Sequence, residues 1–385
     1  MKLKRKLVET FFTGGVTDFK AIDIEKDMEI LNSFPNPNNT IERSVFQYLC
    51  QRTRYSVGFI TRVNLLSLIP VLLIFVVSLL NPFPYIFYNR LNKKNIKGIN
   101  IGISNSLIPK KFHDVKKYDT KFRLYYLLFL DFSDLFDLLK VCFDKKIGTY
   151  FILKCLFKAS KYKYLIMTNS LEYIISSSEY SFTSSYCTHI CNKNSVRSIN
   201  VMHGEKLFNI RDSFCRYDEF WIWDIYYEKV LSDLRGSVSI YNVYNPHTNI
   251  INNDINQTRL LTYYLQDEVE SELHKLNSIL VDLVGQDFYV RPHPILSDVN
   301  TVRSIFGDRI DNLILSDSLF SSKYICSKYS TVLYQAYSVG LNIILDDISN
   351  DQLSNKLCKL GYILSNKDGI SRLSNFKLTG SNDKK

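Results

Sequence analysis

The sequence lacks several features that would place it in other protein classes. None of its eight cysteines forms a CxxC pair, and most lie among apolar neighbours, so we expect reduced core cysteines in a cytosolic protein and no disulfide scaffold. The basic start Met1–Leu7 is followed by acidic and polar residues where a signal peptide needs an apolar core, so no secretion signal is expected. Charged residues make up 22% and hydrophobic residues 46% of the chain, which excludes a largely disordered protein.

No recognisable nucleic-acid-binding module is present either. Lys and Arg outnumber Asp and Glu by 48 to 38, and the net charge of +10 favours an anionic partner such as a nucleotide, a phosphate or an anionic bilayer. The basic residues are spread through the first half of the chain and form no single arm, so we expect no nucleic-acid partner. Nucleic-acid binding stays a minor alternative, which predicts a steep salt dependence.

Metal-binding patterns are scarce. No Asp-x-Asp follows a predicted strand, and the closest carboxylate pair is Asp346–Asp347, whose adjacent side chains are expected to point apart. In Cys187-Thr-His-Ile-Cys191, helical spacing places the two cysteines on one face and His189 elsewhere, which disfavours a zinc site. The sequence therefore predicts no metal site and no cofactor.

A length of 385 residues is right for two domains of ordinary size. The Asn-rich stretch from Asn245 to Thr258 is typical of an inter-domain linker. We predict an N-terminal segment of the acceptor domain (1–60), a hydrophobic membrane-associated segment (61–90), an N-terminal Rossmann-like acceptor domain (91–250), a C-terminal Rossmann-like nucleotide-sugar-binding domain (251–376) and a disordered tail (377–385).

Strand and helix patterns alternate along both halves. Helices are predicted within 122–143 and at 181–192, 226–234, 267–284 and 331–339, and strands at 164–167, 195–202, 220–223, 259–265, 287–291, 312–315, 323–326 and 342–345. Such alternation implies an α/β protein with parallel sheets covered on both faces. In these sheets ligands bind at the carboxyl ends of the strands.

The most apolar segment runs from Leu65 to Leu80 and contains Pro70. It falls just below the length of a spanning helix, and the proline is expected to kink or stop it. Basic residues flank both sides, which favours an interfacial or re-entrant segment over a spanning one. An ordinary buried helix is the alternative.

Two polar constellations follow predicted strands of the second half. Arg291-Pro-His-Pro294 places a cation and an imidazole at a strand end, where Arg291 suits phosphate oxygens and His293 can donate a hydrogen bond. Ser330 and Thr331 begin a helix, whose free N–H groups attract an anion. The simpler alternatives are an Arg291–carboxylate pair, a helix cap at His293 and a plain Ser330 N-cap.

A third constellation is His203-Gly-Glu205, after the clearest strand of the first half. The glycine lets the backbone turn sharply, so His203 and Glu205 could both face an inter-domain cleft, and one of them could act as general base toward a sugar hydroxyl. A turn histidine without a catalytic role is the alternative.

Together, His203-Gly-Glu205, Arg291-Pro-His-Pro294 and Ser330-Thr331 resemble motifs of bacterial surface-polysaccharide glycosyltransferases of the GT-B type, especially CMP-sialic-acid-dependent sialyltransferases. The resemblance covers roughly residues 160 to 350. It implies two Rossmann-like domains facing across a cleft, a CMP-sugar donor with His293, Ser330 and Thr331 on its phosphate, and an inverting, metal-independent transfer. The first motif departs from the family pattern of two acids before a glycine, and Glu179 is another candidate base.

The resemblance also implies a biological setting. The expected acceptor is a lipid-linked oligosaccharide of O-antigen or capsule synthesis, and the expected location is the cytoplasmic face of the bacterial inner membrane. A CDP-glycerol-type or other nucleotide-sugar transferase is one alternative, because the His-Gly pair and Arg-Pro-His-Pro also resemble teichoic acid and capsule polymerases. A non-catalytic, membrane-docked assembly protein is an alternative from another class.

Overall fold

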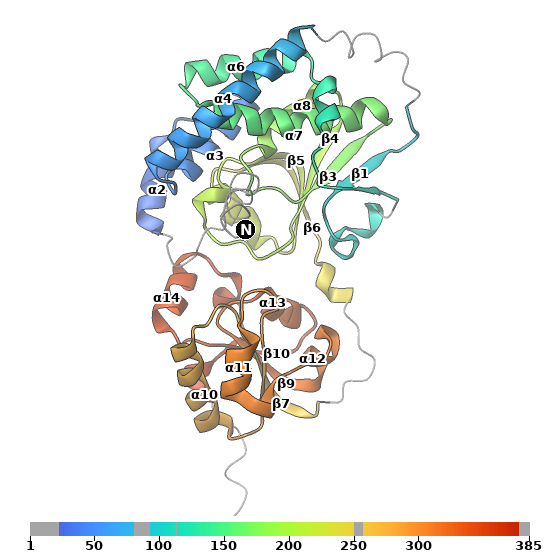
Figure 1. The fold of residues 1–385 in the computed structure, drawn as a ribbon. Coiled ribbons are helices and arrows are strands. Elements are labelled where there is room, and N and C mark those ends of the chain that lie inside the picture. Colours follow the sequence, from blue (N-terminus) through green and yellow to red (C-terminus); the bar gives the residue numbers. More distant parts are fainter. Residues whose placement is uncertain (1–22, 81–92, 113, 250–256, 377–385) are drawn as a thin grey trace, which may run out of the picture. The chain divides into compact units, whose positions relative to one another are not determined.

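A computed structural model describes residues 23–80, 93–112, 114–249 and 257–376. The predictions for residues 1–22, 81–90 and the tail at 377–385 lie outside the described residues. The chain forms two compact units, an N-terminal unit of Met1–His203 and Phe208–Tyr244 and a C-terminal unit of Gly204–Leu207 and Asn245–Lys385. The main division thus lies at the start of the predicted linker, a few residues before the boundary predicted at 250 (Figure 1).

The N-terminal unit is built on a six-stranded sheet with the strand order β2-β1-β3-β4-β5-β6. All neighbouring strands in this sheet are parallel. Its strands are β1 (Gly98–Ile101), β2 (Lys116–Tyr118), β3 (Tyr173–Ser176), β4 (Arg197–Val201), β5 (Arg216–Ile222) and β6 (Ser237–Val243).

Helices of this unit cover the sheet and one another, with the long and largely buried α7 among them. Its α-helices are α2 (Ile24–Ser33), α3 (Thr40–Arg52), α4 (Val57–Leu80), α6 (Phe132–Asp144), α7 (Thr149–Thr168), α8 (Ser184–Lys193) and α9 (Tyr226–Asp233). Its 3-10 helices are η2 (Asn105–Leu107), η3 (Lys110–Phe112), η4 (Leu124–Phe129) and η5 (Ile210–Asp212).

The C-terminal unit has a five-stranded sheet with the order β11-β10-β9-β7-β8, again parallel throughout. Its strands are β7 (Arg259–Tyr264), β8 (Phe288–Arg291), β9 (Ser322–Ser327), β10 (Asn342–Leu345) and β11 (Ser371–Arg372). Its helices are α10 (Glu270–Val284), α11 (Val299–Phe306), α12 (Leu315–Ser321), α13 (Thr331–Ser338) and α14 (Asp351–Lys359), with the 3-10 helices η6 (Pro246–Asn249), η7 (Gly307–Arg309), η8 (Ile363–Asn366) and η9 (Leu373–Asn375).

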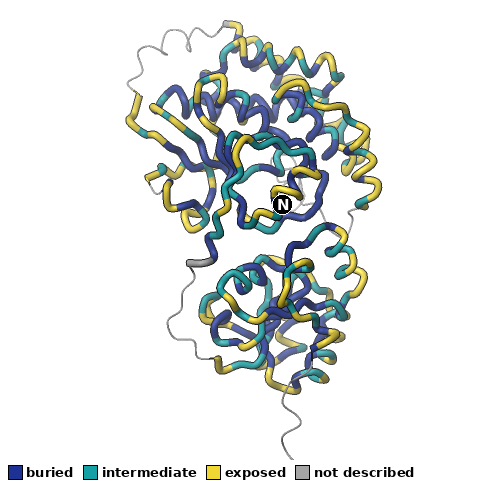
Figure 2. Tube along the Cα trace, turned by 180° about the vertical axis from the view of Figure 1, so that it is seen from behind, coloured by how far each residue is buried: buried dark blue, intermediate teal, exposed yellow. Residues whose placement is uncertain are grey.

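Two parallel sheets with helices confirm the predicted α/β class with two Rossmann-like domains. The sheets are apolar because helices cover them, so strand residues such as Leu261, Phe288 and Ile344 are fully buried in the C-terminal core. Figure 2 shows buried residues gathered in the interior of each unit. Nine of the predicted elements differ from the observed ones only at their ends, among them the strands β4, β7, β8 and β9, and the strand predicted at 342–345 coincides with β10.

Two predicted strands are wrong. Residues 164–167 belong to α7, because their apolar side chains continue the buried surface of a 20-residue helix. Leu315, the last residue of the strand predicted at 312–315, begins the helix α12. Both segments are short apolar runs, in which the residue pattern alone does not separate strand from helix.

The expected break at Pro70 is also absent. Helix α4 is 24 residues long and continues without a break through this proline. Five side chains spaced three or four residues apart, on both sides of Pro70, are buried, while most of the side chains between them are exposed: Val63, Ser67, Val71, Ile74 and Ser78. Packing of this stripe, with α7 as the main neighbour of α4, overrides the low helix propensity of proline. Most other side chains of α4 are exposed, so the alternative of an ordinary buried helix is wrong.

Candidate functional site

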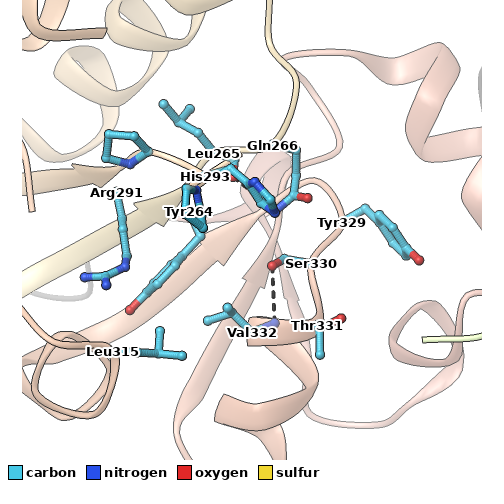
Figure 3. A pocket seen from close by; sticks show the side chains of 12 residues that line it. Tyr264, Leu265, Gln266, Arg291, His293, Leu315, Tyr329, Ser330, Thr331 and Val332 are labelled. Atoms are coloured by element: carbon cyan, nitrogen blue, oxygen red, sulfur yellow. Dashed lines mark hydrogen bonds between the residues drawn. The ribbon is translucent and has the colours of Figure 1, made fainter. Parts of the chain in front are cut away.

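A pocket of about 430 Å³ lies in the C-terminal unit where β7, β8 and β9 end. Because these three strands are parallel neighbours, their carboxyl ends meet at one edge of the sheet. The structure brings all four predicted donor-binding residues to this pocket (Figure 3). Its lining consists of Tyr264, Leu265, Gln266, Arg291, Pro292, His293, Pro294, Leu315, Tyr329, Ser330, Thr331 and Val332.

The imidazole of His293 has a defined tautomer. Its Nδ1 accepts hydrogen bonds from the backbone N–H groups of Ile295 at 3.2 Å and Leu296 at 3.1 Å. A nitrogen that accepts cannot carry the proton, so in the neutral ring the hydrogen resides on Nε2. Burial lowers the pKa of His293 below its ordinary value, which favours this neutral form at pH 7. His293 therefore offers one N–H donor, from Nε2.

The loop that carries His293 is tied to the loop after β7. The backbone N–H of His293 donates to Ser297 Oγ at 2.9 Å, and this hydroxyl donates to the carbonyl of Gln266 at 3.1 Å. Ser327, at the end of β9, donates its hydroxyl to the carbonyl of Tyr264 at 2.7 Å. These bonds hold the three strand-end loops in fixed positions around the pocket.

Arg291 lines the pocket but is also part of an ion cluster around the buried carboxylate of Asp311. Its Nη1 lies 2.8 Å from Asp311 Oδ2 and donates to the carbonyl of Leu313 at 2.7 Å. Arg259 Nη1 binds the other oxygen of Asp311 at 2.8 Å. Among the described residues, Nε and Nη2 of Arg291 have no hydrogen-bond partner. Arg291 thus pairs with a carboxylate, which agrees with the simpler alternative. Its two remaining nitrogens can still bind a ligand.

Ser330 and Thr331 form the start of α13, as predicted. Ser330 is the N-cap residue, and its Oγ accepts from the backbone N–H of Val332 at 3.2 Å. This is the plain capping role, which leaves the hydroxyl hydrogen of Ser330 available as a donor. The other N–H groups of the first turn and the helix dipole favour an anion at this position. None of the described residues that line the pocket is a carboxylate.

The carboxylate pair Asp346–Asp347 has structural roles. Asp346 is buried and accepts from the hydroxyl of Tyr263 and from the backbone N–H groups of Ile348 and Ser349. Asp347 caps Ser374 through both its oxygens. The two side chains point to different partners, as expected for adjacent residues.

The N-terminal unit contains a second polar cluster, at the carboxyl ends of the neighbouring strands β3 and β4. His203 Nδ1 lies 3.5 Å from Glu179 Oε1 and contacts the hydroxyl of Ser177. Glu179 is fully buried, and its Oε2 accepts from Asn200 Nδ2 at 2.9 Å. His203 is 42% exposed. A buried carboxylate beside an exposed imidazole is an arrangement that orients the ring and stabilises its protonated form.

Helix α3 fixes the loop of Glu179 by two glutamines one turn apart. Gln47 Nε2 donates to the carbonyls of Glu179 at 2.7 Å and Arg211 at 2.9 Å. Gln51 Nε2 donates to the carbonyls of Tyr180 at 2.9 Å and Arg211 at 2.8 Å. Neither glutamine was predicted to support the site, and the only signal in the sequence is their spacing of four residues.

Glu205, the other predicted catalytic residue, is part of the second compact unit. His203 belongs to the N-terminal unit, whereas Glu205 belongs to the C-terminal unit. The charge of Glu205 contributes, after burial, to raising the pKa of Tyr362 in that unit. The structure places Glu179, the further candidate base, in contact with His203.

The cysteines of the former zinc candidate are ordinary core residues. Cys187 and Cys191 are buried on α8, and His189 Nε2 lies 3.7 Å from Asp137 Oδ2. Within the described ranges, no group of three His, Cys, Asp or Glu side chains is arranged to hold a metal ion.

No protein-family model and no curated protein matches the sequence. Several solved structures are similar at low identity. A UDP-N-acetylglucosamine 2-epimerase from Listeria monocytogenes, itself described as putative, is 11% identical, with 71% of this chain and 89% of that chain covered and a TM-score of 0.41. HepE of Anabaena, solved with UDP and glucose, is 8% identical over 66% and 81% of the two chains, with a TM-score of 0.40.

The wall teichoic acid polymerase TagF is 10% identical over 77% of this chain and 81% of that chain, with a TM-score of 0.36. Similarities of this size carry no argument about function.

Proposed function

We propose that this protein is a glycosyltransferase of the GT-B type that transfers a sugar from a nucleotide-activated donor in bacterial surface-polysaccharide synthesis. The proposed donor is a CMP-sugar, with CMP-sialic acid as the first candidate, and the proposed acceptor is a lipid-linked oligosaccharide. The reaction is an inverting displacement.

One observation carries the proposal: the pocket of the C-terminal unit offers hydrogen-bond donors and no carboxylate. His293 Nε2–H, the hydroxyls of Ser330 and Thr331 and the first turn of α13 all suit the oxygens of a phosphate. Two nitrogens of Arg291 add positive charge. A nucleoside monophosphate leaving group needs such a site, because negative charge develops on its phosphate as the bond to the sugar breaks.

His203 is the proposed general base. The acceptor hydroxyl oxygen forms a bond to the anomeric carbon, the bond from that carbon to the phosphate oxygen breaks, and the hydroxyl proton moves to His203 Nε2. Glu179 faces the opposite nitrogen, Nδ1, and its carboxylate stabilises the imidazolium that results. Glu179 is a positioning residue in this scheme, because it is fully buried.

The test is thermal stabilisation of the purified protein by CMP, CDP, UDP and GDP. Wild type is compared with His293→Asn, whose Oδ1 can accept the loop N–H groups that Nδ1 accepts, but which lacks the Nε2–H donor. Loss of one hydrogen bond to a charged phosphate, about 1.5–3 kcal/mol, corresponds to a roughly tenfold to hundredfold lower affinity for CMP.

Stabilisation by CMP that is lost in His293→Asn supports the proposal. Stabilisation by UDP or GDP instead would overturn the donor and keep the reaction class. Undiminished CMP binding by His293→Asn would remove His293 from the phosphate site. No response to any nucleotide would favour the alternative of a non-catalytic assembly protein.

A further inference from the structure

The outer surface of α4 has the reverse of the pattern found on helices that face water. From Leu65 to Leu79 every exposed residue is apolar, and two of the five buried stripe residues, Ser67 and Ser78, are polar. A helix on a water-exposed surface shows polar residues outward and apolar residues inward. Nine large apolar side chains are exposed here: Leu65, Leu66, Leu68, Ile69, Leu72, Leu73, Val76, Val77 and Leu79.

Neighbouring elements extend this surface. Figure 1 shows α4 running along α6 and α7, and the ring of Phe75 on α4 contacts Phe132 on α6 at 6.1 Å between centroids. The exposed aromatic residues of α6 recur at helical spacing, as Phe132, Phe136 and Phe143. The 3-10 helix η4, which also contacts α4, exposes Leu124 and Leu128. We call the exposed apolar residues of α4, α6 and η4 the apolar face.

Basic side chains accompany the apolar face. Arg62 on α4, Lys140 on α6 and Arg123, directly before η4, are all exposed. An apolar surface of this size on a water-soluble protein marks an interaction site. Positive charge next to apolar side chains fits the boundary of a bilayer that contains anionic phospholipid, in which acyl chains lie beside phosphate groups.

The packing of α4 decides how the helix meets a bilayer. Among the described residues, α4 is the single helix that is both long enough and apolar enough to cross a membrane. However, its stripe from Val63 to Ser78 is buried along the whole apolar stretch, chiefly against α7, which is itself part of the core of the unit. A helix held along its length by its own domain cannot cross the bilayer alone.

We propose that α4, α6 and η4 form a monotopic membrane-docking surface, on which α4 lies parallel to a bilayer that contains anionic phospholipid. This inference does not depend on the proposed glycosyl transfer. It would place the N-terminal unit on the membrane whether or not the chain is an enzyme.

The first experiment measures cosedimentation of the full chain with vesicles of phosphatidylcholine alone and with phosphatidylglycerol added. We expect about tenfold stronger binding with the anionic lipid, because each basic residue near the surface adds to the attraction. Leu66→Gln with Leu73→Gln should weaken binding about tenfold per leucine. Ile225→Gln, which changes an equally exposed apolar residue at the start of α9, is the matched control and should bind as wild type.

The second experiment measures depth. Leu66 and Leu73 lie seven residues apart on the same face of α4, so each is replaced by Trp in a separate variant and quenched by lipids brominated at different acyl positions, after subtraction of the wild-type signal. Equal depths support a helix that lies in the plane. A difference of about 10 Å would overturn it in favour of a spanning helix.

Two further outcomes would also overturn the proposal. One is absence of vesicle binding. The other is a dimer in solution that Leu66→Gln with Leu73→Gln dissociates, because the apolar face would then bind a second copy of the chain. Nucleotide binding by the C-terminal unit is measured separately. Failure of the membrane proposal can therefore be distinguished from failure of the proposed function.

Discussion

Asp311 is the residue at which the structure makes its sharpest prediction about stability. Its carboxylate is almost fully buried and binds Arg259 through Oδ1 and Arg291 through Oδ2, each at 2.8 Å. The same Oδ1 accepts from the backbone N–H of Leu313 at 3.1 Å. Asp311→Asn removes the negative charge and places an amide donor against a guanidinium. Removing one partner of a buried ion cluster costs about 3–5 kcal/mol, so we expect the C-terminal unit to lose that amount of unfolding free energy.

This loss is measured by urea denaturation that is monitored with both tryptophan fluorescence and circular dichroism. Both tryptophans, Trp221 and Trp223, lie in the N-terminal unit, so their fluorescence reports that unit, whereas far-ultraviolet circular dichroism reports both. We expect the variant to show an early dichroism transition with an unchanged fluorescence transition. Asp308→Asn, which changes an exposed carboxylate of the same unit, should alter stability by less than about 0.5 kcal/mol.

The pKa of Asp311 predicts how the stability of the C-terminal unit depends on pH. Burial alone would raise it, but hydrogen bonds from Ser318, Arg259 and Arg291 outweigh burial and hold the pKa below its ordinary value of 3.8. The stabilisation is therefore complete above pH 3.8 and is lost as the pH falls through the lower folded-state value. A loss of less than about 1 kcal/mol in Asp311→Asn would refute the view that this carboxylate holds the two arginines together.

Two other predictions concern single buried side chains. Burial lowers the pKa of His247 to about 4, so unfolding should take up a proton below pH 6.5. The C-terminal unit should therefore lose stability from pH 6.5 down to about 4, by at most about 1.4 kcal/mol per pH unit. In His247→Phe this pH dependence should be absent from urea denaturation across that range, and an unchanged dependence would assign it to another group. Gln47→Leu removes a buried donor to the carbonyls of Glu179 and Arg211. The free energy of unfolding, measured by tryptophan fluorescence, should fall by about 1–3 kcal/mol. An unchanged value would contradict the role of α3 in holding the loop of Glu179.

The sequence allowed most of the C-terminal unit to be predicted. Its strands are apolar runs bounded by polar turns, and the strand predicted at 342–345 coincides with β10. The rule that ligands bind at the carboxyl ends of parallel strands then predicts one site for Arg291, His293, Ser330 and Thr331. The partner of Arg291 could not be predicted, because Asp311 lies 20 residues away along the chain and meets it only through the loop after β8.

The N-terminal unit was harder to predict for physical reasons. Strand β3 has only four residues, and the apolar run predicted as a strand at 164–167 is the end of α7. Without β3, no argument could place Glu179 next to His203, since the contact depends on β3 and β4 being neighbours in the sheet. The course of α4 through Pro70 likewise depends on packing against α7, which no local pattern encodes.

The two clusters differ in charge in a way that separates their roles. The described residues that line the pocket of the C-terminal unit supply donors and no carboxylate, so an anion gains stabilisation there. The cluster of the N-terminal unit has a buried carboxylate behind an exposed imidazole, so it stabilises an added proton and would repel a phosphate. A reaction that releases a nucleotide phosphate and takes a proton from a hydroxyl needs both kinds of site. For this reason, loss of His203 is expected to abolish transfer while nucleotide binding persists, and loss of His293 is expected to weaken both.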